Sequence, residues 1–167
     1  MGAWGRSGLD PSQFKALIVR QTLARLGLDD PAAVNLLVGT ALAESGLVFL
    51  RQINGPALGV FQLEPATHDD CWSSFLSSGP ELAASVRAIA GGPVAAPGGP
   101  PAAGLMVSSL AYACAMARIA YYRAPADLPR APDALGLSAY PKRHSNPAPG
   151  AANPPSHPQF FLTVLQS

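Results

Sequence analysis

The acidic residues of the chain fall into two groups, those that begin helices or turns and two that do not. The sequence has 10 acidic residues. Helix starts and proline-flanked turns explain eight of them: Asp10, Asp29, Asp30, Asp69, Asp70, Glu81, Asp127 and Asp133. Of the remaining two, Glu44 follows an apolar helical run, whereas Glu64 directly precedes a proline. A carboxyl held among apolar groups has a raised pKa and can donate a proton to a leaving oxygen near neutral pH. Glu44 is therefore a candidate general acid for glycosidic cleavage. The alternative is a glutamate on a solvated helix face.

The position of Glu44 at the end of its helix is unfavourable for a charged carboxylate. Asp29 and Asp30 before Pro31 are a helix-start signal, and the apolar periodicity that follows ends at Gly46. Glu44 thus lies in the last turn, where the negative end of the helix dipole disfavours a carboxylate by about 0.3–1 kcal/mol. A placement that costs stability suggests a functional role.

The remaining elements predict an all-α fold with long irregular connections. Helical spacing and capping signals predict further helices over 10–27, 67–76, 80–89 and 105–123. Residues 91–104 form a Gly/Pro-rich loop, and 124–155 is Pro-rich with a short helix over 133–140. Residues 159–165 are apolar enough for a last strand or a docking segment. We expect one domain over 1–167, with 151–167 as a docking tail.

Composition excludes several classes of function. Charged residues make up 13% of the chain, the net charge is +1 and no Lys/Arg cluster occurs, so nucleic acid is not an expected partner. The N-terminus lacks an apolar core of signal-peptide length, and no stretch reaches the ~18 apolar residues of a membrane span. His68, His144 and His157 show no ligand spacing, so we expect no metal and no cofactor. Cys71 and Cys114 permit one disulfide, but two buried thiols are the favoured interpretation.

Two sequence motifs resemble a known family. The first is Glu44-Ser45-Gly46, and the second is the segment 59–67, GVFQLEPAT. Together they resemble the lysozyme-like soluble lytic transglycosylases, in which an E-S pair ends a helix and G-x-[MF]-Q-x-x-P-A-T follows. Residues 105–122 are similar to the long helix behind the cleft of that family. Residues 139–140 and 147–150 are weakly similar to its A-Y-N-x-G-P-G segment. The resemblance spans about residues 31–150 and implies a lysozyme-like helical domain.

The resemblance implies a role for each matching residue. Glu44 is expected to be the catalytic acid/base, and Ser45 to orient it or the acetamido group of the substrate. Gly59 and Gln62 are expected to line a cleft for peptidoglycan glycan strands, and Phe61 to form its apolar wall. Tyr140 is expected to hydrogen-bond near Glu44 from the opposite side of the cleft. Core packing is the alternative for both Phe61 and Tyr140.

Two departures from the family pattern bear on mechanism. Pro141 stands where the family has an asparagine after the tyrosine. Glu64 replaces a residue that is usually apolar, so a second carboxylate either reaches the cleft and activates water or lies on the surface before Pro65. With Glu44 alone, the implied reaction is a transglycosylation that leaves a 1,6-anhydro sugar. Two-carboxylate hydrolysis needs a partner about 5–9.5 Å away, for which Glu64, Asp69 and Asp70 are the candidates.

The segment 55–72, GPALGVFQLEPATHDDCW, also resembles a subset of these proteins encoded by tailed bacteriophages. Such proteins are carried in the particle, which would explain a substrate outside the cytoplasm without an export signal. This resemblance implies a location in the virion, in the tail, with other tail proteins as partners. The competing hypothesis is a structural tail protein that keeps the fold and has little or no catalytic activity; the low charge and the Pro/Gly-rich connections favour it.

Overall fold

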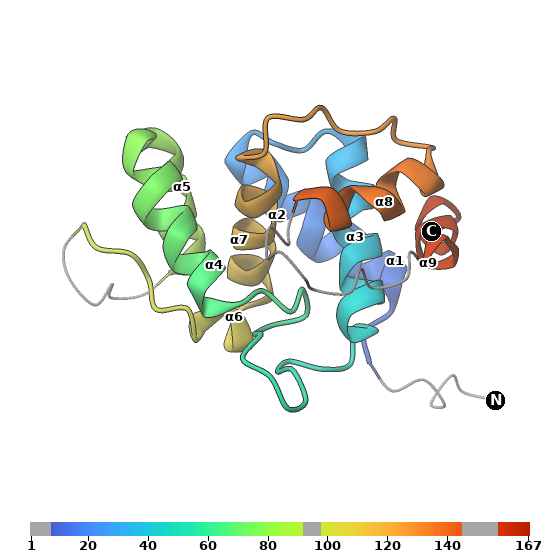
Figure 1. The fold of residues 1–167 in the computed structure, drawn as a ribbon, viewed down its shortest axis with the longest axis horizontal. Coiled ribbons are helices and arrows are strands. Elements are labelled where there is room, and N and C mark those ends of the chain that lie inside the picture. Colours follow the sequence, from blue (N-terminus) through green and yellow to red (C-terminus); the bar gives the residue numbers. More distant parts are fainter. Residues whose placement is uncertain (1–7, 92–97, 145–156) are drawn as a thin grey trace.

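The computed structural model describes residues 8–91, 98–144 and 157–167, which form an all-α arrangement (Figure 1). The first helical stretch comprises α1 (Pro11–Gln13), the π-helical η1 (Phe14–Val19) and α2 (Arg20–Leu26). It is followed by α3 (Pro31–Ser45), α4 (Pro65–Asp70), η2 (Cys71–Phe75), η3 (Leu76–Ser78) and α5 (Pro80–Ala90). The last elements are α6 (Leu105–Ser108), α7 (Leu110–Tyr122), α8 (Ala134–His144) and α9 (Pro158–Leu165). Within the described residues there is no strand, and β pairing is limited to the isolated bridges Arg51–Leu58 and Leu58–Leu63. The predicted all-α class is confirmed.

Helix α7 lies at the centre of the fold. Every residue from Tyr112 to Tyr121 is buried, because α2, α3, α5 and η1 all pack against this helix. Apart from Arg118, whose Nε donates to the Leu28 carbonyl, this stretch carries no charge, as expected of a core helix, and its alanines allow its neighbours to approach closely. The sequence predicted one helix over 105–123, but Ser109 divides it. Its extended backbone ends α6, and its side chain accepts a hydrogen bond from the Tyr112 N–H to cap α7.

The C-terminal segment is a helix and not a strand. Helix α9 packs on α3 and α8 at the right of Figure 1. Gly39 of α3 makes this contact possible, since a Cβ atom there would lie 2.3 Å from the Phe161 ring. The end of α9 is held by Lys15, whose buried Nζ donates to the carbonyls of Val164 and Ser167 at 2.8 and 2.9 Å. Burial lowers the pKa of this ammonium group.

Most helix starts agree with the prediction, and two boundaries differ. Asp10 and Asp30 cap α1 and α3 through bonds from the N–H groups of Gln13 and Ala32, as their position before proline predicted. Helix α4 begins at Pro65, two residues before the predicted start, because proline is well suited to the first helical position. Helix α8 extends beyond the predicted residue 140 and contains Pro141.

The two cysteines are buried free thiols, in line with the favoured interpretation. Burial raises the pKa of Cys71 to about 11.

Three predicted features fall partly or wholly outside the described residues: the centre of the 91–104 loop, the motif segment 147–150, and the part of the 151–167 tail that precedes His157.

Candidate functional site

Glu44 occupies the last turn of α3, as predicted from the sequence. The helix ends at Gly46, which adopts a left-handed conformation and donates its N–H to the Leu42 carbonyl at 3.0 Å. The chain then turns sharply at Leu47, which also has a positive φ of 59° although its side chain is buried. Gly46 and Leu47 thus end the helix directly after the Glu44–Ser45 pair.

The environment of Glu44 favours the protonated carboxyl. Glu44 is exposed, as the alternative of a solvated helix face expected, although the protein around the carboxyl still raises its pKa above the ordinary glutamate value by desolvation. The positive form of His157, the residue that precedes α9, acts in the opposite direction and is the smaller effect. The direction agrees with the sequence-based expectation and suits a group that must donate a proton.

Hydrogen bonds of the Ser45 side chain link the C-terminal end of α3 to the segment at Val60. Its side chain is buried, and its Oγ lies 3.0 Å from the Ala41 carbonyl and 2.6 Å from the Val60 carbonyl. The same oxygen accepts a hydrogen bond from the Leu47 N–H at 3.2 Å. The hydroxyl is therefore engaged with backbone groups, and it joins the end of α3 to the segment at Val60.

Gly59 and Gln62 form one tight turn beside this junction. Gly59 has a φ of 72°, and a Cβ atom there would lie 2.5 Å from the Met106 carbonyl oxygen, so glycine is required both for the backbone conformation and for the contact with α6. Its carbonyl accepts from the backbone N–H of Gln62 at 3.0 Å and from the side-chain Nε2 at 2.8 Å. The Gln62 side chain is half-buried, and its φ of 50° is held by this turn.

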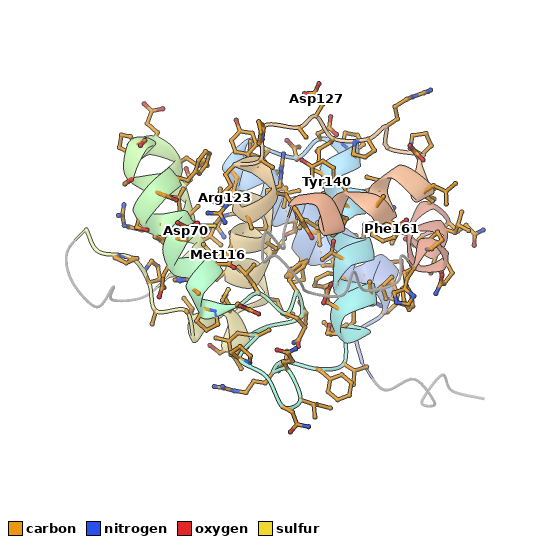
Figure 2. All side chains as sticks on the ribbon, viewed as in Figure 1. Asp70, Met116, Arg123, Asp127, Tyr140 and Phe161 are labelled. Carbon is orange, nitrogen blue, oxygen red and sulfur yellow. The ribbon has the colours of Figure 1, made fainter. Side chains whose placement is uncertain are left out.

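The structure places Phe61 and Tyr140 in packed positions. Phe61 is buried with its ring 6.0 Å from that of Phe14, so it belongs to the core. Tyr140, labelled in Figure 2, is buried on α8 and donates its hydroxyl to the Ala126 carbonyl at 2.9 Å. Its ring meets that of Tyr121 at 5.9 Å. These placements match the packing alternative for both residues.

Tyr140 is nevertheless linked to α3 through Tyr121 and Thr40. The Thr40 hydroxyl lies 2.8 Å from the Leu36 carbonyl, to which it donates, and 3.2 Å from the Tyr121 hydroxyl. Thr40 lies one helical turn before Glu44. The two tyrosines therefore brace the glutamate-bearing helix from the side of α7 and α8.

The other acids considered for a second catalytic carboxylate differ in their surroundings. Glu64 is exposed at the residue before α4, where its side chain makes no capping bond. Asp69 binds the Nδ1 of His68 at 2.8 Å, and Asp70 forms an ion pair with Arg123 (Figure 2). That ion pair and a hydrogen bond from Ser74 lower the pKa of Asp70. Asp69 and Asp70 are therefore occupied in contacts within the protein.

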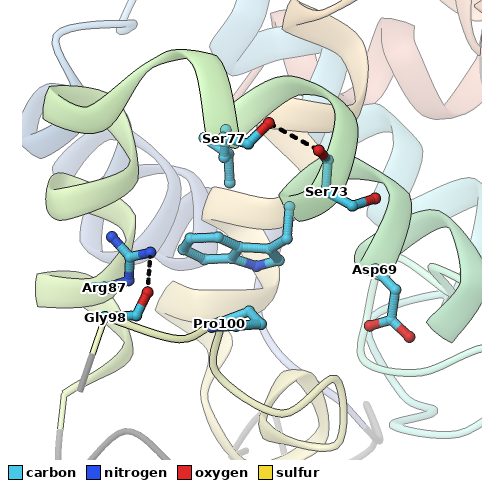
Figure 3. A pocket seen from close by; sticks show the side chains of 8 residues that line it. Asp69, Ser73, Ser77, Arg87, Gly98 and Pro100 are labelled. Atoms are coloured by element: carbon cyan, nitrogen blue, oxygen red, sulfur yellow. Dashed lines mark hydrogen bonds between the residues drawn. The ribbon is translucent and has the colours of Figure 1, made fainter. Parts of the chain in front are cut away.

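A hollow of about 470 Å³ lies elsewhere, between η2, η3, α5 and the segment at Pro100 (Figure 3). Its lining residues are Asp69, Trp72, Ser73, Leu76, Ser77, Arg87, Gly98 and Pro100. The Arg87 guanidinium stacks 5.0 Å from the Trp72 ring and donates to the carbonyls of Gly98 and Gly99. Asp69 is the one candidate carboxylate among the lining residues, and none of Glu44, Ser45, Gly59, Phe61, Gln62 and Tyr140 lines this hollow.

A buried hydrogen-bond chain fixes Trp72 at this hollow. Trp72 Nε1 donates to the Tyr112 hydroxyl at 3.1 Å, so that hydroxyl can donate to His68 Nε2 at 2.7 Å. With Nε2 as the acceptor, the Nδ1 of His68 donates to Asp69. The chain satisfies each of these buried polar groups, which is what a well-ordered core requires, and burial raises the pKa of Tyr112.

The described residues contain no group of three or more His, Cys, Asp or Glu side chains that could hold a metal ion. In the same part of the chain, no helix combines the length and the hydropathy needed to cross a membrane. Comparison of the chain with protein-family models, curated proteins and solved structures finds no match.

Sequence reasoning did not identify His157 or the Thr40–Tyr121 pair as part of this region. His157 is 113 positions from Glu44 in the sequence, and only the docking of α9 on α3 brings its charge close enough to act on the carboxyl. Thr40 and Tyr121 lie within apolar helical runs, where their hydroxyls have no local sequence signature. The one available signal was the four-residue spacing between Thr40 and Glu44, which places them on the same face of a helix.

Proposed function

We propose that this chain is a lysozyme-like lytic transglycosylase that cleaves the glycan strands of peptidoglycan, with Glu44 as the acid/base. The observation that carries the proposal is a glutamate whose pKa desolvation raises, at the end of a buried helix that Ser45 fastens to the Gly59–Gln62 turn. The E-S and G-V-F-Q motifs, 15 residues apart, thus meet at one junction.

The proposed reaction needs one carboxyl group. Glu44 protonates the oxygen that links N-acetylmuramic acid to N-acetylglucosamine, and the bond from that oxygen to the anomeric carbon breaks. The acetamido group of the substrate stabilises the cationic sugar. The Glu44 carboxylate then removes the proton of the muramyl 6-hydroxyl, whose oxygen bonds to the anomeric carbon. The product is a 1,6-anhydro sugar, no water is consumed, and Glu44 returns to its protonated form.

The assay is solubilisation of purified peptidoglycan, followed by mass spectrometry of the released muropeptides. We expect anhydro products, each lighter by one water than the corresponding hydrolysis product. Glu44→Gln removes the proton donor with little change of shape and is expected to lower the rate by about 10²–10⁴-fold. Retention of most activity by a folded Glu44→Gln variant would remove Glu44 from the mechanism.

Glu64 decides between transglycosylation and hydrolysis. Its exposed position before Pro65, in extended backbone, is a poor support for a carboxylate that must position a water molecule. We therefore expect Glu64→Gln to leave both the rate and the anhydro products unchanged. Reducing-end products that disappear in Glu64→Gln would instead establish hydrolysis with Glu64 as the base.

We further propose that the protein is carried in the tail of a phage particle, with other tail proteins as partners, and acts during penetration of the cell wall. This location rests on the resemblance of residues 55–72 to phage-encoded proteins. Mass spectrometry of purified particles is the test, and detection in lysates but not in particles would indicate a lysis enzyme. A particle protein that solubilises no peptidoglycan would support the structural alternative.

A further inference from the structure

Four large apolar side chains gather on the loop that follows Glu44. Val48, Phe49 and Leu50 are 43–48% exposed and Ile53 is 68% exposed, although large apolar side chains usually lie inside a protein. Leu9, also exposed, joins the base of this loop because its N–H donates to the Leu47 carbonyl at 3.2 Å. We call the exposed side chains of residues 48–53 the apolar tip.

Hydrogen bonds within the loop hold the apolar tip in its exposed position. The Gly59 N–H donates to the Leu50 carbonyl at 2.8 Å, and the Gln52 N–H donates to the Ala57 carbonyl at 2.9 Å. The Gln52 side chain closes the loop by accepting from the Ala57 N–H at 3.2 Å. Leu47 and Asn54 at its two ends both have a φ of 59°, a conformation that costs leucine free energy and that asparagine adopts more readily. The chain thus holds these apolar groups in water at a cost.

The charges on this loop are complementary to an anionic surface. Arg51 is the one charged residue between positions 45 and 63, and it is exposed within the apolar tip. The acids that flank the segment, Glu44 and Glu64, lie at its two ends, where the loop joins α3 and α4. A cation on a loop that carries exposed apolar side chains matches the boundary between anionic headgroups and acyl chains in a bilayer.

The size and shape of the apolar tip fit a bilayer better than a protein partner. A stable protein interface takes about 20–30 residues and about 800 Å² from each side. The apolar tip offers four side chains, and the segment between α3 and α4 projects from the helical body at the bottom of Figure 1. A small projecting apolar group can enter the headgroup region of a bilayer without a complementary surface.

We propose that the apolar tip is a membrane-surface site that inserts Phe49 and Ile53 into an anionic bilayer while Arg51 contacts lipid phosphate. This inference does not depend on the proposed peptidoglycan cleavage, although the apolar tip would hold Glu44 near the bilayer surface. It assigns the loop a partner of defined chemistry, a lipid surface bearing phosphate groups.

The test is co-sedimentation of the full chain with vesicles of phosphatidylcholine, alone or mixed with an equal part of phosphatidylglycerol. We expect binding to the mixed vesicles that weakens with salt. Ile53→Asp is expected to lower the partition coefficient at least about tenfold. The matched control is Leu135→Asp on α8, since Leu135 is 71% exposed and lies outside the apolar tip; it is expected to bind as the unchanged chain does. Arg51→Gln should weaken binding to the mixed vesicles alone.

Circular dichroism verifies that each variant is folded, and Phe49→Ser provides a second test if Ile53→Asp is not. The proposal is overturned if the unchanged chain does not sediment with either vesicle, or if Ile53→Asp and Leu135→Asp weaken binding equally. A dimer in light scattering that Ile53→Asp dissociates, without vesicle binding, would identify the apolar tip as a contact between copies of the chain. The Glu44→Gln variant should bind vesicles normally, so failure of the catalytic proposal and failure of this one are separate outcomes.

Discussion

At the scale of single residues, Glu44 combines two unfavourable placements. Desolvation raises its pKa, and the C-terminal end of α3 presents carbonyl groups to its carboxylate. Both effects disfavour the charged carboxylate. At neutral pH they therefore reduce the stability of the folded protein relative to a variant with a neutral side chain at this position. This conflict between stability and charge is common at functional sites.

The first prediction follows from that cost. Because the folded-state pKa of Glu44 is raised, its contribution to stability is complete below the pKa of the unfolded chain and is lost as pH rises through the folded pKa. Glu44→Gln should therefore raise Tm at pH about 7 by about 1–3 °C and have no effect at pH about 3.5. Thermal melts at both pH values test this, with Glu64→Gln as the control at a carboxyl that precedes a helix and does not end one. A lower Tm at neutral pH in Glu44→Gln would contradict the assigned environment.

The pH dependence of wall cleavage is the second prediction. A general acid works while it is protonated, so activity should persist above the ~4.3 of an ordinary glutamate and fall as pH rises through the raised pKa of Glu44. Since the positive form of His157 lowers this pKa, His157→Gln should move the basic limb to higher pH. The pH profiles of kcat/KM for both proteins provide the measurement. A shift to lower pH in His157→Gln would show that the imidazole does not act on Glu44 in this way.

At the scale of elements, the turn at Gly59 determines how the two motifs meet. Its left-handed backbone and its contact with the Met106 carbonyl leave no space for a side chain. Gly27, which ends α2 with a similar φ of 67°, has no atom within 4 Å of the position that a Cβ would occupy. Alanine substitutions at the two glycines therefore distinguish two contributions to the free energy of unfolding, the cost of the backbone conformation and the cost of a steric clash.

We predict that Gly27→Ala lowers the free energy of unfolding by about 1–2 kcal/mol, the cost of the left-handed conformation alone. Gly59→Ala should lower it by about 1–3 kcal/mol more, because α6 must move away from the new methyl group. Urea denaturation of both variants measures the difference. Equal effects of the two substitutions would mean that α6 moves away from the new methyl group at little cost in free energy.

Local sequence signals predicted the helix starts well because capping is a local interaction. Asp10 and Asp30 act within three residues of themselves, so their helices were predicted at the correct start. Ser109 was missed because its break in the helix interrupts an apolar run without a proline or glycine to mark it. The placement of Phe61 in the core depends on Phe14, 47 positions away in the sequence, and that contact has no local signal.

At the scale of the whole molecule, α9 completes the core and the region around Glu44 together. It packs on α3 and α8, seats Phe161 over Gly39, and brings His157 close to Glu44. Figure 2 labels Phe161 at the α9 side of the molecule. The apolar character of residues 159–165 could be recognised from the sequence but their packing partner could not, because a glycine inside a helix does not reveal which ring will cover it.

The last prediction concerns this docking. Phe161 is buried, whereas its neighbour Leu162 is more than half exposed on the same helix. Phe161→Ala should lower the free energy of unfolding by about 3–5 kcal/mol, because it removes a buried ring and leaves a cavity above Gly39. Leu162→Ala should change it by no more than about 0.5 kcal/mol. Urea denaturation compares the two, and similar small effects would show that α9 contributes little to the stability of the fold. If α9 instead releases in Phe161→Ala while the remaining helices stay folded, the pH profile of cleavage should shift as it does in His157→Gln.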